Sequence, residues 1–307
     1  MAEKPAKQSK SDAFNKTSAE GAPSSPTFNR TELIAQVKGI LAKNVAEKNN
    51  TYKTYGEDEE LNPTPNQKDL MKEIANKTMV FVDGPFGTGK TLWTTYMGLA
   101  GLAAKQYKRI AITAPAVEAG EKLGFLPGEA DSKMLPYINQ ILESIDDWIG
   151  KDLRMKLQDA GVIDIEPQAY LRGRTMKKTF FILDESQNAS GPQLMTALSR
   201  LGNGSTFVFM GDNRQNDRTK GDSAYVQFMN RFAVPKYMDE GYVGHVVLGT
   251  EDVRRHPFLK LIVENNDERP LEQFETHHSG GNVAVLKAHQ KNGSNGHAHV
   301  QPQQKPS

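Results

Sequence analysis

Five short apolar runs stand out in the pattern of hydrophobic and polar positions along this chain. Each run is nearly continuous and is bounded by glycine or polar residues, which is typical of a strand that is covered on both faces of a parallel sheet. We therefore predict five buried strands. They are residues 78–83, 109–113, 179–183, 205–210 and 244–248.

Between these runs, apolar residues recur at helical spacing. Strands that alternate with helices predict an α/β fold, with a mostly parallel sheet and helices on both of its faces. A further amphipathic helix is predicted over residues 31–48. The residues at helical spacing on its apolar face are Leu33, Ile34, Val37, Ile40, Leu41 and Val45. The helices predicted between strands are residues 90–106, 117–123, 135–149 and 192–200.

Composition divides the chain into four regions. Residues 1–28 and 277–307 contain few large apolar side chains, so they cannot offset the entropy cost of ordering, and we predict disordered tails. Residues 29–60 are predicted to form the N-terminal helix and a connector. Residues 61–276 are predicted to form one domain that carries the predicted sheet.

Charge and composition exclude several classes of site. The chain has 38 Lys and Arg against 37 Asp and Glu, so any contact with nucleic acid must come from a local patch. The absence of cysteine excludes disulfides and thiolate metal sites. No apolar stretch is long enough to span a membrane, and the N-terminus lacks the apolar core of a signal peptide. We therefore expect a cytoplasmic protein without membrane contact.

The segment "VDGPFGTGKTLW" follows the first predicted strand and opens a predicted helix. Gly84, Gly89, Lys90 and Thr91 fit the phosphate-loop spacing, in which backbone N–H groups and a helix N-terminus surround the phosphates of a nucleotide. We expect Lys90 to face solvent and to reach the β- and γ-phosphates, and Thr91 to offer its hydroxyl to Mg²⁺. The predicted nucleotide-binding residues of the loop are Gly84, Pro85, Phe86, Gly87, Thr88, Gly89, Lys90 and Thr91.

The run "TFFILDESQN" ends a second buried strand in Asp184 and Glu185. Carboxyl ends of parallel strands are where ligands bind, so we expect Asp184 to hold Mg²⁺ and Glu185 to polarise an attacking water. Alternatively, the two acids cap the helix that follows. Gln215, after the next strand, is expected to contact the γ-phosphate or its attacking water.

Several blocks together resemble the PhoH family of P-loop ATPases. They are "DGPFGTGKT", "EAGEKLGFLPGEADSKMLPY", "YLRGRTMKKTFFILDESQN", "LSRLGNGSTFVFMGDNRQND" and "EDVRRHPF", which occur in the family's order over roughly residues 62–265. The chain looks like a compact, phage-type member, for which the host cytoplasm is the expected location. Ser186 and Phe86 stand where alanine is usual in the family, beside the reacting groups rather than on them.

The family in turn is similar to the first motor domain of superfamily 1 helicases. That resemblance implies a single RecA-like P-loop domain that uses ATP and Mg²⁺, with Gln67 reading adenine and Thr113-Ala114-Pro115 touching single-stranded nucleic acid. It implies RNA or single-stranded nucleic acid as substrate by analogy only. Because sequence for a second motor domain is missing, unwinding would require assembly into a ring or a stack, and we expect a homo-oligomeric ring, with a hexamer as one form. The arginine that completes the site is expected among Arg172, Arg174 and Arg255, with Arg255 preferred.

Two further functions remain open from the residues. An ATP-switched binding module would bind ATP and recruit a protein or RNA partner without mechanical work. A small-molecule kinase fits less well, since Glu185 and Gln215 have no evident role in it and no arginine-rich lid segment is present. Stimulation of ATP turnover by single-stranded RNA would favour the motor function over the binding module.

Overall fold

Six parallel strands form the main sheet of the computed structural model, which describes residues 29–46, 51–56, 60–115, 129–171, 173–213 and 223–268. Their order across the sheet is β6-β5-β7-β8-β4-β9, and each neighbouring pair is parallel. The strands are β4 (Met79–Asp83), β5 (Arg109–Thr113), β6 (Ile163–Ile165), β7 (Thr179–Leu183), β8 (Thr206–Gly211) and β9 (Val243–Val247).

Both faces of the central strands are buried. Val80 and Val82 of β4 belong to one hydrophobic cluster, whereas Phe81 between them belongs to the other. Successive side chains of a strand point to opposite faces, so a strand covered on both sides must be apolar at every position. This explains why the sequence pattern showed continuous runs rather than alternation.

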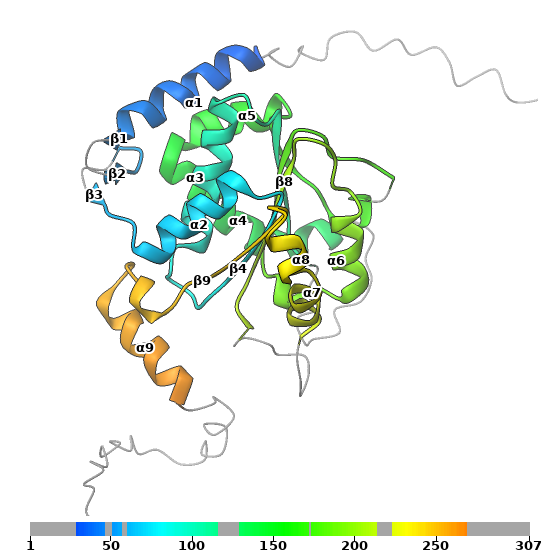
Figure 1. The fold of residues 1–307 in the computed structure, drawn as a ribbon. Coiled ribbons are helices and arrows are strands. Elements are labelled where there is room, and N and C mark those ends of the chain that lie inside the picture. The colour runs from blue at the N-terminus through cyan, green and yellow to red at the C-terminus, as the bar shows by residue number, and fades with distance from the viewer. Residues whose placement is uncertain are drawn as a thin grey trace, which may run out of the picture. The chain divides into compact units, whose positions relative to one another are not determined.

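Two layers of helices supply the partners of these faces (Figure 1). The first hydrophobic cluster contains residues of α1 (Arg30–Asn44), α2 (Pro65–Asn76), α3 (Lys90–Ala103), α4 (Glu129–Ile149) and α5 (Lys151–Asp159). The second contains residues of α6 (Gly191–Leu198), α7 (Ala224–Phe232) and α8 (Pro235–Met238). The predicted α/β architecture, with helices on both faces of a parallel sheet, is therefore confirmed.

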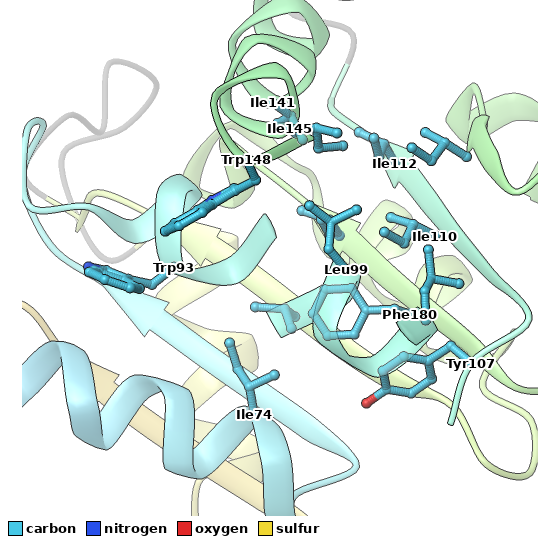
Figure 2. Packing of buried hydrophobic residues seen from close by; sticks show 14 of the residues in the cluster. Ile74, Trp93, Leu99, Tyr107, Ile110, Ile112, Ile141, Ile145, Trp148 and Phe180 are labelled. Atoms are coloured by element: carbon cyan, nitrogen blue, oxygen red, sulfur yellow. The ribbon is translucent and has the colours of Figure 1, made fainter. Parts of the chain in front are cut away.

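The predicted N-terminal helix is shorter than expected. It ends at Asn44, and a small antiparallel sheet follows in place of a plain connector, made of β1 (Val45–Ala46), β2 (Thr51–Lys53) and β3 (Glu60–Leu61). Tyr52 of β2 explains the difference, because its ring packs edge-on against Trp93 and Tyr96 at centroid distances of 5.0 and 5.2 Å. Trp148 of α4 lies in the same aromatic group, 5.8 Å from Trp93 (Figure 2).

The other predicted elements that lie within the described residues are confirmed to within three residues at each end, except that α4 begins at Glu129, six residues before the predicted start. Strand β6 was missed because it has three residues and carries Asp164, so it does not read as an apolar run. The helix predicted at 117–123 and both predicted tails lie outside the described residues. Helices absent from the prediction are α2, α5, α7, α8 and α9 (Pro257–Glu268).

Missing α2 was avoidable. Its N-cap Thr64 accepts a hydrogen bond from the backbone N–H of Gln67, and the Gln67 side chain bonds back to the backbone of Thr64. This is a capping box, which the spacing Thr-x-x-Gln indicates in the sequence. Within the described part of the chain, no helix has the length and apolar character that a membrane crossing requires.

Candidate functional site

The carboxyl ends of four neighbouring strands bring polar side chains to one edge of the sheet. Asp83 ends β4, Thr113 ends β5, and Asp184 and Asp212 directly follow β7 and β8. The phosphate loop leaves the same edge after β4 and enters α3 at Lys90. The topology therefore gathers Thr113, Asp184 and the phosphate loop, which were predicted from separate motifs, together with Asp83 and Asp212.

The backbone path of the loop requires glycine at two positions. A Cβ on Gly84 would lie 2.6 Å from the carbonyl oxygen of Leu248, which leaves no room for a side chain. Gly89 has φ of +83° at the N-cap of α3, and a Cβ there would lie 3.1 Å from Cδ1 of Trp93. The loop thus curls into a helix N-terminus, the arrangement that suits an anionic phosphate group.

The ammonium of Lys90 is turned back onto its own loop. Its Nζ donates to the carbonyl oxygens of Gly84 at 2.6 Å and Pro85 at 2.9 Å, and the side chain is partly buried. The expectation that Lys90 faces solvent was therefore wrong, because the loop carbonyls supply acceptors within reach. Burial lowers the pKa of Lys90, and nearby carboxylates, led by Asp184 and Asp212, oppose that shift.

Asp184 is a buried carboxylate, 5% exposed. Burial first, and then repulsion from Glu185, raise its pKa from 3.8 to about 6, whereas the Glu185 N–H, which donates to Oδ1 at 2.9 Å, and the charge of Lys90 act in the opposite direction. Because burial disfavours the charged form of this carboxylate, a cation beside it would stabilise that charge. The binding of Mg²⁺ by Asp184 remains a prediction.

Glu185 adopts an uncommon backbone conformation, with φ of +52°. Its side chain accepts hydrogen bonds from Gln187 Nε2 at 2.6 Å and from Asn188 Nδ2 at 3.4 Å. It precedes the short 3₁₀ helix Ser186–Asn188 but makes no side-chain capping bond there, so the alternative reading of a helix cap does not apply. A non-glycine residue in the left-handed region is held there by its surroundings, and such positions cluster at functional sites.

Sequence reasoning missed the part that Gln187 plays. The residue is 4% exposed, and its Oε1 accepts the backbone N–H of Asp212 at 3.1 Å while its Nε2 holds Glu185. One amide thus joins the ends of β7 and β8. The signal in the sequence was a glutamine two residues after an acidic pair, but only the fold shows that it spans two strands.

Asp83 and Asn213 form a second link that was missed. The two carboxylate oxygens of Asp83 accept from Asn213, at 3.1 Å from the backbone N–H and at 2.6 Å from Nδ2. The end of the phosphate-loop strand is therefore tied to the segment after β8. Gln215 lies just beyond Asn213, outside the described residues, and its predicted contact with the γ-phosphate remains a prediction.

Gln67 is placed beside the loop, but its amide is already occupied. Its Nε2 donates to the carbonyl oxygens of Thr88 at 2.9 Å and Asp252 at 3.3 Å, and its Oε1 accepts from the Thr64 N–H at 2.9 Å. The side chain is 3% exposed. These bonds make Gln67 a link between α2 and the phosphate loop, and the adenine contact remains a prediction.

Comparison with known proteins identifies the family. The sequence profile described as "PhoH-like protein" matches residues 61–267. The chain is 38% identical over 208 residues to the PhoH-like protein of Bacillus subtilis (strain 168), and this match covers 67% of the chain. It is 39% identical over 227 residues to the PhoH-like protein of Mycobacterium leprae (strain TN), covering 73% of the chain. The chain belongs to the PhoH-like family.

These matches cover 63% and 62% of the two relatives, so the chain aligns with a little under two thirds of their length. Among solved structures, the UvsW helicase from Bacteriophage T4 is similar with a TM-score of 0.41 and 14% identity, over 72% of this chain and 68% of that one. The Pif1 helicase from Candida albicans is similar with a TM-score of 0.33 and 18% identity, over 66% of this chain and 43% of that one.

The arginines of this PhoH-like chain differ in where they lie. Arg255 is exposed, and its Cβ lies 4.0 Å from the position that a Cβ on Gly87 would occupy, so its backbone runs beside the phosphate loop. Arg174 is also exposed and lies 3.7 Å from Glu166, away from the loop. Arg172 lies outside the described residues. Of the two described candidates, only Arg255 borders the loop.

The remaining predicted loop residues lie around this centre. Thr91 follows Lys90 in the first turn of α3 and is partly buried. Thr88 is buried and its hydroxyl donates to the carbonyl oxygen of Pro85 at 2.8 Å. The Thr113 hydroxyl is buried at the same sheet edge without a hydrogen-bond partner among the described residues.

Proposed function

We propose that this chain binds ATP with Mg²⁺ at the phosphate loop and hydrolyses the γ-phosphate, and that turnover is coupled to RNA or single-stranded nucleic acid in a homo-oligomer. The observation that carries the proposal is the cluster at the sheet edge, where Lys90 lies among the carboxylates of Asp83, Asp184, Glu185 and Asp212. Among the described residues, a cation and several anions thus gather at this edge, which supports a site for a phosphate chain and its metal.

The residues fit a nucleotide. The loop is shaped by glycines that admit no side chain, and its amides and the N-terminus of α3 favour anionic phosphates. Lys90 would exchange its two carbonyl acceptors for charged phosphate oxygens, and charge-assisted bonds of this kind are stronger. Asp184 and Thr91 would hold Mg²⁺, which when bound neutralises charge on the phosphates.

Glu185 is the proposed general base. Its carboxylate would accept a proton from the attacking water, and the amide of Gln187 holds it in a fixed orientation next to the loop. Arg255 is the proposed source of positive charge at the transferred group, because the described segment that carries it borders Gly87.

The nucleic-acid role rests on the resemblance of the motifs to helicase motor domains. The described residues form one parallel sheet of the kind found in a single motor domain. Two-domain helicases grip nucleic acid between two motor domains, so we propose that several copies of this chain assemble. The alternative of an ATP-switched binding module shares the same nucleotide site and differs only in turnover and its stimulation.

The test is ATP turnover by the full chain with and without single-stranded RNA, combined with a mass measurement in solution. We expect Mg²⁺-dependent turnover that RNA stimulates, and a mass of several subunits. Lys90→Ala serves as the control that should lose ATP binding while keeping the fold. Tight ATP binding with negligible turnover, unaffected by RNA or single-stranded DNA, would instead assign the binding module, and unchanged ATP binding by Lys90→Ala would refute the site.

A further inference from the structure

Strand β9 forms one outer edge of the main sheet, and half of its backbone groups point away from the sheet. On the inner side, the Tyr242 carbonyl accepts from Met79 N at 2.9 Å and Leu248 N donates to Asp83 O at 2.8 Å. Backbone groups of alternate residues face opposite sides of a strand. Those of Val243, His245 and Val247 therefore face outward, where no described strand pairs with them.

The opposite edge of the sheet carries protective features that β9 lacks among the described residues. Strand β6 has only three residues, and Asp164 in it and Glu166 just after it are bound by Arg109 at 2.8 and 2.7 Å. Short edge strands and edge charges are devices that prevent unwanted pairing. Strand β9 has five residues and no Asp, Glu, Lys or Arg, and Val247 is 54% exposed.

A groove of about 560 Å³ runs along β9 between residues of α2 and the end of α8. Asp69 and Glu73 line it from α2, and Asp239 lines it next to α8. Among the described lining residues, Lys77 is the only lysine or arginine, and it donates its Nζ to the Met238 carbonyl oxygen at 3.2 Å. The described walls of the groove therefore carry more negative than positive charge.

The groove also holds an unsatisfied polar atom. Nε2 of His245 is buried and has no hydrogen-bond partner among the described residues. A buried polar atom without a partner costs free energy. The outward-facing backbone groups of β9, for which no described strand provides partners, carry the argument for an incoming segment.

We propose that β9 is a docking strand that pairs with an extended, basic segment of a partner protein, which adds a seventh strand to the sheet. Backbone hydrogen bonds to Val243, His245 and Val247 would supply the pairing, and lysine or arginine side chains of the segment would face Asp69, Glu73 and Asp239. A second copy of this chain is a poorer occupant, because pairing β9 with β9 would bring like-charged grooves together.

Hydrogen exchange of the full chain tests this directly. The probes are synthetic peptides of about eight residues in which valine alternates with lysine, and a matched set in which valine alternates with glutamate. The lysine peptides should slow exchange of the outward amides of Val243, His245 and Val247 by about tenfold or more. The amides of Gly244 and Val246, which face β4, should change little, and added salt should weaken the effect.

Three variants sharpen the test. Val247→Pro removes an outward N–H without removing a bond to β4, so the chain should fold and bind ATP normally but lose peptide protection, whereas Val247→Ala should keep it. Asp69→Asn combined with Asp239→Asn should weaken binding of the lysine peptides about tenfold. No protection at about 1 mM peptide, or equal binding of the glutamate peptides, would overturn the proposal. Concentration-dependent protection of these amides without any peptide would assign the edge to self-association instead.

Discussion

Two neighbouring residues at the sheet edge have features that are unfavourable for the stability of the fold. Glu185 lies in the left-handed backbone region, and its neighbour Asp184 is a buried carboxylate with a raised pKa. Both features lower stability, and both place charge where a metal and a water would be used. Functional sites commonly retain such costs because activity depends on them.

Glu185→Gln tests the base at this scale. Glutamine keeps the shape and the ability to bond Gln187, but it cannot accept a proton as a carboxylate does. Turnover of ATP should fall by roughly a hundredfold or more while ATP binding persists, which steady-state kinetics and equilibrium binding together would measure.

A graded comparison comes from Gln187→Leu, which leaves the Glu185 carboxylate in place but removes the amide that holds it. Its turnover should fall by less than that of Glu185→Gln. Near-normal turnover in Glu185→Gln would assign the base to Asp184 or another group, and loss of ATP binding would make Glu185 structural.

Asp184→Asn should stabilise the nucleotide-free protein. The folded pKa of Asp184 is raised from 3.8 to about 6, so between those values the folded state keeps a proton that the unfolded state has released. Stability attributable to this group therefore falls as pH rises from about 4 to about 6, and the cost is complete above that window. Thermal unfolding at about pH 7.5 should show a melting temperature roughly a few degrees higher for the variant.

The gain should shrink toward about pH 4 and vanish about one pH unit lower, where the carboxyl is protonated in both states. Asp69→Asn is the matched control, because that side chain is exposed. If the melting temperature rises equally at both pH values, or at neither, then burial of the Asp184 charge does not destabilise the fold. Asp184→Asn should also lose Mg²⁺-dependent turnover.

At the scale of elements, one buried carboxylate ties α2 to the segment after β9. Asp252 lies in the 3₁₀ helix Thr250–Asp252 and is 0% exposed. It accepts from the Thr64 hydroxyl, from Asn66 Nδ2 at 3.0 Å and from the Gly249 N–H at 2.7 Å. Gln67 extends this network to the phosphate loop through Thr88, so these three segments are expected to move together.

Gln67→Ala therefore has an expected outcome that differs from adenine recognition. Loss of the bonds to Thr88 and Asp252 should loosen the loop and raise the Michaelis constant for ATP and for GTP by similar factors, roughly tenfold. Lys68→Ala, on an exposed position of the same helix, should leave both constants unchanged. A larger loss for ATP than for GTP would return Gln67 to the role of an adenine reader.

The same residue shows what the sequence could and could not predict. The loop and the acidic pair were predictable because their chemistry lies in consecutive residues that follow a buried strand. The role of Gln67 depends on Asp252, which is 185 positions away in the chain, and a glutamine before a phosphate loop fits either role. Likewise, the link that Gln187 makes to Asp212 exists only because β7 and β8 are neighbours in the sheet.

At the scale of the whole molecule, the question is which subunit supplies the arginine that completes the proposed nucleotide site. Arg255 lies beside the phosphate loop of its own chain, so Arg255→Ala should lower turnover by about a hundredfold or more. Mixing Arg255→Ala with Lys90→Ala should then restore little activity, because neither subunit has a complete site. Arg174→Ala is the comparison, and it should retain turnover, since Arg174 faces Glu166.

Recovery of activity in the mixture would place Arg255 in the site of a neighbouring subunit. The proposed assembly is checked separately, by whether turnover per subunit rises with protein concentration. A concentration-independent monomer with full activity would remove the oligomer from the proposal but leave the nucleotide site intact.

The aromatic group around Trp93 gives this chain a built-in optical probe. The sequence contains two tryptophans, and both lie in that group, 5.8 Å apart (Figure 2). Cδ1 of Trp93 lies 3.1 Å from where a side chain on Gly89 would begin, and the Trp148 indole donates to the Leu92 carbonyl oxygen at 3.0 Å. All tryptophan emission therefore originates close to the phosphate loop, so occupancy of that loop should be readable as a change in intrinsic fluorescence without any label.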